Sequence, residues 1–112
     1  MTVAFWICAL VTFASAAVSL GYSLVAVRQS RADARTASLY AAARSVSLVV
    51  VAVVAPFTGA LPFVAAIAIA MIVVQAIDAG IGVAIRDRVK TFGPALTAAA
   101  NLAALLWMLG SR

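Results

Sequence analysis

The sequence predicts an all-α integral membrane protein in which four transmembrane helices form a bundle. Of the 112 residues, 67% are hydrophobic and only 10% are charged, whereas soluble domains average about 45–50% and about 25%. A soluble domain of this size buries only about 65% of its unfolded surface, so it could not keep this much apolar area from water. The apolar stretches are near or above the roughly 18–20 residues that cross the hydrocarbon core. They cover residues 3–27, 36–57, 61–85 and 91–109.

Each stretch is expected to be a helix, because a single segment in lipid must satisfy its own backbone hydrogen bonds. The first stretch contains Ala14-Ser15-Ala16, which looks like a signal-peptide cleavage site. It lacks a basic amino-terminal region and is too long for a signal peptide, so we interpret it as a membrane span. Residues 56–62 join the second and third stretches, and two prolines and one glycine there favour a tight reversal. With no linker or low-complexity tract, residues 1–112 are predicted to form one domain.

The charges of the loops predict the orientation of the bundle. Loops 28–35 and 86–90 carry six of the eight basic residues, whereas residues 56–62 carry no charge. The positive-inside rule then places loops 28–35 and 86–90 in the cytoplasm and both termini on the outer, periplasmic side. Because the composition is also rich in alanine, as in high-GC bacterial genomes, we expect a multi-pass protein of the bacterial inner membrane.

The composition also argues against several classes of site. Cys8 is the one cysteine and histidine is absent, so we expect no disulfide within the chain, no metal site and no haem. The basic residues lie between apolar runs instead of among stacking aromatics, so nucleic acid is not an expected partner. Paired carboxylates, a GxSxG sequence and a phosphate-binding loop are missing as well. We therefore expect no cofactor.

Two charged residues interrupt the apolar stretches at the same predicted depth. Arg44 is nine residues past Arg35 and Asp78 is eight residues before Arg86, so both lie about 12–13 Å from the cytoplasmic face at 1.5 Å per residue. Antiparallel helices joined by a short turn are expected to be neighbours. An unpaired charge at the centre of a span costs roughly 2.5–3.5 kcal/mol. We expect Arg44 and Asp78 to pair, shielded from lipid by all four helices.

Two simpler interpretations of this pair stay open. Arg44 can extend its long side chain to the cytoplasmic interface while Asp78 is protonated. Alternatively, Arg44 and Asp78 form a pair that only fixes the register of the helices.

Other polar residues form a stripe along each predicted helix. The stripes contain Thr12, Ser15, Ser19 and Tyr22 in the first helix, Tyr40, Arg44 and Ser47 in the second, Gln75 and Asp78 in the third, and Thr97 and Asn101 in the fourth. If the four stripes face inward, they form a hydrogen-bonding chamber in the cytoplasmic half of the bundle. Its candidate ligand-binding residues are Tyr22, Tyr40, Ser19, Gln75 and Asn101. The alternative is that these side chains bond their own helix or hold helices together.

The candidate catalytic residues are Asp78 and Arg44. An aspartate held by an arginine can act as a general base on a small lipophilic molecule, which favours isomerase, cyclase or epoxide-opening chemistry. A carboxylate whose pairing breaks on binding is equally typical of a small transporter. A non-catalytic accessory subunit of a larger membrane complex is the third hypothesis. Besides the bilayer and the ligand, alanine-rich helix faces favour a homo-oligomer or a larger complex as partners.

Three short segments suggest a relationship to known proteins. They are Tyr40–Ser45 (YAAARS) in the second helix, Gln75–Gly80 (QAIDAG) in the third, and Phe92–Pro94 (FGP) at the start of the fourth. The chain resembles, over most of its length, the DoxX-like four-helix bacterial membrane proteins of unknown function. The resemblance implies the fold, an interior basic residue and a late aspartate. Where some relatives have a second carboxylate after the arginine, this chain has Ser45, so a two-acid mechanism does not carry over.

Overall fold

The computed structural model describes residues 2–29 and 31–110, excluding the side chains of residues 32, 33, 89 and 90. Residue 30 of the predicted loop 28–35 and residues 1, 111 and 112 lie outside the described part. The described elements are α1 (Val3–Gln29), α2 (Ala32–Val54), the 3-10 helix η1 (Ala55–Thr58), α3 (Leu61–Ala84) and α4 (Arg88–Gly110). The predicted all-α class and the four long helices are confirmed. The helices α2 and α4 begin earlier than predicted, because residues that favour helix extend them beyond the apolar stretches: alanine and arginine in α2, arginine and lysine in α4.

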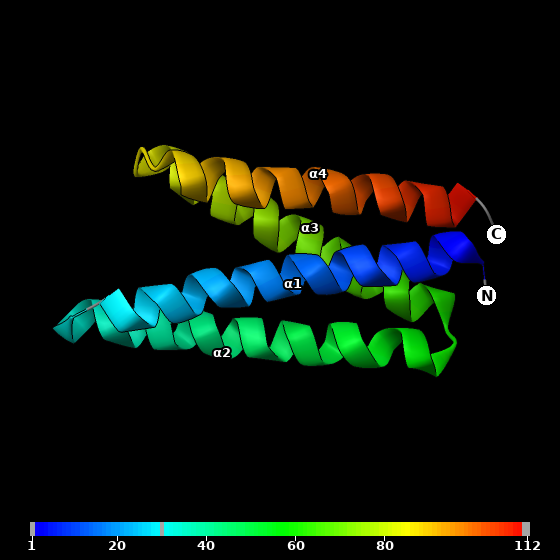
Figure 1. Ribbon diagram of the computed structural model, residues 1–112, viewed down its shortest axis with the longest axis horizontal. Helices are drawn as coiled ribbons and strands as arrows, with labels where there is room; N and C mark the ends of the chain where they lie inside the picture. The colour runs from blue at the N-terminus through cyan, green and yellow to red at the C-terminus, as the bar shows by residue number, and fades with distance from the viewer. Residues whose placement is uncertain (1, 30, 111–112) are drawn as a thin grey trace.

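The four long helices are antiparallel to their neighbours in sequence, and both ends of the described chain lie at the same end of the bundle (Figure 1). With 23 to 27 residues each, they are about 35–40 Å long. Each is long and apolar enough to cross a membrane. The outer surface is apolar, since Leu10, Val50, Ile77 and Leu106 are exposed on α1, α2, α3 and α4. This is the surface of a multi-pass membrane protein.

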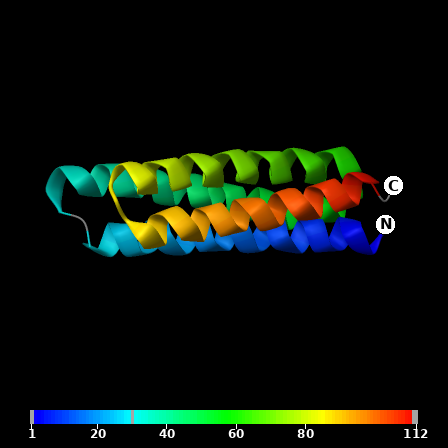
Figure 2. The same cartoon turned by 90° about the horizontal axis from the view of Figure 1, so that it is seen from above.

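The helix α1 occupies the centre of the packing. Within the described residues it contacts α2, α3 and α4, whereas α2 packs mainly on α1 and α3 packs mainly on α4. Small side chains permit this close approach, because the buried face of α1 is largely alanine, serine and threonine. The pairs α1/α2 and α3/α4 meet at the end that holds the termini and diverge toward the other end (Figure 1). In the view from above, α2 and α3 form one layer and α1 and α4 the other (Figure 2).

The second and third spans are neighbours, as predicted, but the contact between them is limited. The helices α2 and α3 make the sparsest contact of any two long helices that touch in the described chain. They are tied together at one end by η1 and Gly59, whose φ of 71° is a left-handed conformation that glycine adopts without strain. Away from this turn they separate, because α2 packs mainly on α1 and α3 packs mainly on α4.

The buried side chains divide the bundle into two halves of different chemistry. Near the termini and η1 the core is apolar and includes the fully buried Phe5, Val64, Met71 and Met108. Toward the opposite end the buried side chains are polar. These are Ser15, Ser19, Ser23, Ser45 and Gln75. Most of the buried polar side chains therefore lie in the half of the bundle in which the two helix pairs diverge, whereas Thr12 and Asn101 are buried between α1 and α4 nearer the termini.

The connection between α3 and α4 reverses the chain through an unusual arginine. The N–H of Asp87 donates to the carbonyl of Gly82 at 3.0 Å, and the N–H of Arg86 donates to that of Val83 at 3.1 Å. This is the Schellman pattern, in which the residue after the helix is left-handed and is usually glycine. Here Arg86 takes that position with a φ of 59°.

Candidate polar pocket between the helix pairs

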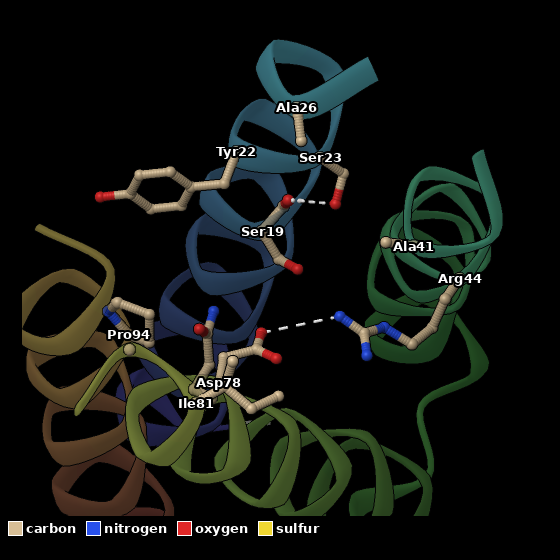
Figure 3. A pocket seen from close by; sticks show the side chains of 11 residues that line it. Ser19, Tyr22, Ser23, Ala26, Ala41, Arg44, Asp78, Ile81 and Pro94 are labelled. Atoms are coloured by element: carbon tan, nitrogen blue, oxygen red, sulfur yellow. Dashed lines mark hydrogen bonds and ion pairs between the residues drawn. The ribbon is translucent and has the colours of Figure 1, made fainter. Parts of the chain in front are cut away.

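A pocket of about 170 Å³ lies in the polar half, where the two helix pairs diverge. All four long helices line it, and Figure 3 shows the side chains around the space. Its walls contain Ser19, Tyr22, Ser23, Ala26, Ala41, Arg44, Gln75, Asp78, Ile81, Gly82 and Pro94. Of the candidate residues from the sequence, Ser19, Tyr22, Arg44, Gln75 and Asp78 are thus brought together. Tyr40 and Asn101 are not among the lining residues.

Arg44 and Asp78 reach toward each other across the pocket from α2 and α3 (Figure 3). Nη2 of Arg44 lies 3.6 Å from Oδ2 of Asp78, which is longer than the 2.7–2.9 Å or so of a charge-assisted hydrogen bond. The structure records no other polar contact of the Arg44 side chain with the described residues. The guanidinium therefore has most of its five N–H donors available to another acceptor in the pocket.

The two side chains are less shielded than the sequence suggested. The Arg44 side chain is 47% exposed and that of Asp78 is 25% exposed. Four helices do not enclose them, because α2 and α3 separate at this level and leave the gap between them open. The expectation of complete shielding is therefore wrong.

The polar face of α2 is rotated from the predicted stripe. Tyr40 is 75% exposed on the outer surface, and the exposed Ser47 donates its hydroxyl proton to the carbonyl of Ala43 at 3.0 Å. The expectation that these two residues join Arg44 in the interior is wrong. The geometric reason is that α2 packs on α1 through the neighbouring positions Ser45 and Ala52.

Ser45 is the interior residue that the sequence interpretation missed. It is fully buried, and its Oγ lies 3.0 Å from that of Ser19 and 3.1 Å from that of Ser23. Ser23 also donates to the carbonyl of Ser19 at 2.9 Å. The signal was present as a row of small residues at positions 41, 45, 52 and 55, spaced for one face of a helix. This serine cluster joins α2 to α1 beside the pocket.

Gln75 and Tyr22 connect α1 to the other pair. Nε2 of Gln75 donates to the carbonyl of Ser15 at 2.9 Å, and both residues are buried. The ring of Tyr22 extends toward α4 (Figure 3), where a Cβ added to Gly93 would lie 2.5 Å from its Oη. Glycine at position 93 thus leaves room for the phenol that forms one wall of the pocket.

Asn101 lies apart from the pocket, fully buried against α1. Its Oδ1 is 3.0 Å from Oγ1 of Thr12, which is also 2.7 Å from the carbonyl of Cys8. Nδ2 has no partner among the described residues. If the amide were turned over, Nδ2 would meet Thr12 and Oδ1 would lose its partner. Asn101 is therefore a half-satisfied contact between α1 and α4, while the predicted role in ligand binding is not supported by its position.

The chain offers few groups for metal binding. The described residues contain no cluster of three histidine, cysteine, aspartate or glutamate side chains that could hold a metal ion. Comparison with known proteins gives no further guide, since no family model, no curated protein and no solved structure matches this chain.

The pocket places a strong donor beside an acceptor in a mostly apolar setting. The guanidinium of Arg44 can donate hydrogen bonds, and the carboxylate of Asp78 can accept them. Ala26, Ala41 and Ile81 supply apolar wall around them. A hydrogen bond to a charged group is worth about 1.5–3 kcal/mol when it is made and satisfied in a buried place. The arrangement can orient a small polar group that carries an apolar substituent.

Proposed function

We propose that this protein binds a small lipophilic molecule within the membrane, at the pocket between the two helix pairs. The observation that carries the proposal is the loose 3.6 Å contact between Arg44 and Asp78 at the wall of a 170 Å³ space. A pair that served only as a structural contact would gain by closing to a true hydrogen bond. A ligand that inserts between the two groups gains one hydrogen bond with each.

The proposed setting is the bacterial inner membrane, with loops 28–35 and 86–90 in the cytoplasm and both termini outside. The excess of basic residues in those loops supports this orientation. The pocket then lies in the cytoplasmic half of the bilayer, and the apolar core around Phe5 and Met71 separates it from the outer face. The resemblance to DoxX-like proteins is consistent with this setting.

Catalysis is one use of such a site. The Asp78 carboxylate would accept a proton from the bound molecule, and Arg44 would donate hydrogen bonds to an oxygen that becomes negative. Tyr22 lies on the same pocket and offers a phenolic O–H. Isomerisation, cyclisation and epoxide opening are reactions that a base and an oxyanion donor in this relation can promote. Transport would use the same two side chains, because a bound ligand would replace the contact between Arg44 and Asp78.

The accessory-subunit hypothesis has one specific observation in its favour. Arg44 and Asp78 bridge α2 and α3 at a level where the two helices are otherwise apart. In that case the pair holds the bundle together and the pocket stays without a lipophilic ligand. The ligand-binding and accessory-subunit hypotheses differ in whether a lipophilic compound co-purifies with the protein.

The test compares the lipophilic compounds that co-purify with wild type, Asp78→Asn and Asp87→Asn. Asp87 is a matched control, because it is a carboxylate of the same chain in the turn between α3 and α4. Mass spectrometry of organic extracts is expected to find one compound enriched with wild type and Asp87→Asn and depleted about tenfold with Asp78→Asn, the equivalent of about 1.4 kcal/mol. Circular dichroism and gel filtration establish that each variant is folded. Equal amounts in all three samples, or no enriched compound in wild type, would contradict the proposal.

A further inference from the structure

The pocket has a side opening toward the membrane. The helices α2 and α3 meet near η1 and separate beyond it, so on that side the pocket is bounded by the side chains of Arg44 and Asp78 (Figure 3). Arg44 is 47% exposed there. Because α2 and α3 cross the bilayer, a gap between them at this depth faces acyl chains. A molecule dissolved in the membrane can reach the pocket without passing through water.

The size of the pocket limits which part of a ligand it can hold. A cavity of about 150 Å³ in a protein interior admits a six-membered ring such as benzene, and this one measures about 170 Å³. A head group of about six non-hydrogen atoms fills it. The pocket has no room for a long hydrocarbon chain in addition to the head group. The hydrocarbon chain must therefore lie in the gap between α2 and α3 and continue into the bilayer.

The charges of the pocket limit what that head group carries. Arg44 and Asp78 are the charged residues of its lining, one of each sign, so together they are neutral. A charged head group would leave one net charge in a poorly solvated place, which costs several kcal/mol. An uncharged head group with one hydrogen-bond acceptor and one donor can accept from the guanidinium of Arg44 and donate to the carboxylate of Asp78. Both charges then remain balanced.

We propose that the ligand is an uncharged, single-chain amphiphile that enters sideways between α2 and α3, its head bearing neighbouring hydroxyl groups or a hydroxyl beside a carbonyl. This inference rests on the proposed function, because it assumes that the pocket binds a lipophilic molecule. It adds the chemical class of that molecule, its route of entry and the position of its chain.

The experiment uses the full chain in lipid nanodiscs with three photoactivatable probes of equal chain length. They are 1-monooleoylglycerol, oleate and oleylamine, each with a diazirine in the chain, representing a neutral, an anionic and a cationic head. Crosslinks are mapped by mass spectrometry, and unlabelled lipid competes for the specific fraction. We expect about tenfold more specific crosslinking with the monooleoylglycerol probe, and crosslinks of its chain to α2 and α3 rather than to α1 and α4.

Two alanines on α2 provide a matched pair of variants that keep both charges. Ala41 lines the pocket and Ala43 is exposed on the outer surface. Ala41→Leu fills the space and is expected to reduce specific crosslinking about tenfold, whereas Ala43→Leu leaves it unchanged. Both substitutions add the same apolar side chain to the same helix, so a general effect on insertion would change both.

The outcomes separate this inference from the proposed function. Stronger crosslinking by oleate or oleylamine, reduced by Ala41→Leu, would overturn the neutral head while retaining the binding site. Chain crosslinks on α1 and α4 would overturn sideways entry. If a compound co-purifies with wild type but no probe crosslinks specifically, the proposed class is wrong and the site stands. If no probe crosslinks and nothing co-purifies, both proposals fail.

Discussion

At the scale of single residues, Asn101 shows how a buried amide can be only half satisfied. One end of the amide meets Thr12, and Nδ2 has no partner in the described part of the chain. Thr12 does not depend on it, because its hydroxyl also lies 2.7 Å from the carbonyl of Cys8. An unsatisfied buried donor costs about 1–3 kcal/mol.

Replacing Asn101 with leucine, which has nearly the same branched shape, is therefore expected to raise the free energy of unfolding by about 1 kcal/mol. Gln75→Leu is the contrasting variant, because it removes the donation to the Ser15 carbonyl and is expected to lower that free energy by a similar amount. Unfolding in mixed micelles of mild detergent and dodecyl sulfate measures both. A loss of stability with Asn101→Leu would show that the amide holds α1 and α4 together.

Arg86 is a second residue whose type does not suit its place in the structure. Its φ of 59° is the left-handed conformation that favours glycine. Arg86→Gly is expected to be more stable than Arg86→Ala by about 1 kcal/mol, because alanine keeps the strain of a Cβ. Both variants remove the same charge, so the difference between their free energies of unfolding measures the cost of the left-handed backbone conformation at position 86. Equal stabilities would mean that the turn relaxes without strain.

At the scale of elements, the orientation of α2 decides which of its serines matters. Ser45 is buried between α1 and α2, where its Oγ contacts those of Ser19 and Ser23. Ser47, two residues later, is exposed on the outer face. The polar residues of the sequence predict an inner face along Tyr40, Arg44 and Ser47. The row of small residues through Ser45 was the better guide, since close helix packing needs small side chains.

Leucine at these two positions gives a direct test of that orientation. Ser45→Leu forces a large side chain between α1 and α2 and is expected to lower the free energy of unfolding by about 1–3 kcal/mol. Ser47→Leu places the same side chain toward lipid, where the expected change is within about 0.5 kcal/mol. The same micelle unfolding assay compares them. A larger loss from Ser47→Leu would mean that α2 is rotated toward the predicted stripe.

At the scale of the whole molecule, the apolar stretches predicted the four helices and their order, and the structure confirms them. Composition succeeds here because length and apolarity alone decide whether a segment can span a membrane. Depth along the helix axis placed Arg44 and Asp78 at one level, and the structure brings their side chains to 3.6 Å. The divergence of the helix pairs was not predictable, because it depends on how α1 packs between its neighbours and not on the content of any single helix.

The orientation of the whole bundle is tested by cysteine labelling in intact cells. In a Cys8→Ser background, Thr58→Cys at the end of η1 is expected to react with a membrane-impermeant maleimide, because that turn faces outward in the proposed topology. Thr36→Cys, near the opposite end of the bundle in α2, is expected to react only after permeabilisation. The reverse pattern would invert the topology and move the pocket to the outer half of the bilayer.

The proposed site has a guanidinium and a carboxylate that face each other across a pocket inside the membrane. Solid-state NMR of the chain in lipid bilayers can observe this directly, as a dipolar contact between side-chain ¹⁵N of arginine and the carboxyl ¹³C of aspartate, assigned to Arg44 and Asp78 by its loss in Asp78→Asn. We expect that contact, at a distance compatible with the 3.6 Å between Nη2 and Oδ2. An Arg44 guanidinium that contacts only water and lipid phosphate, with no signal from Asp78 nearby, would contradict it.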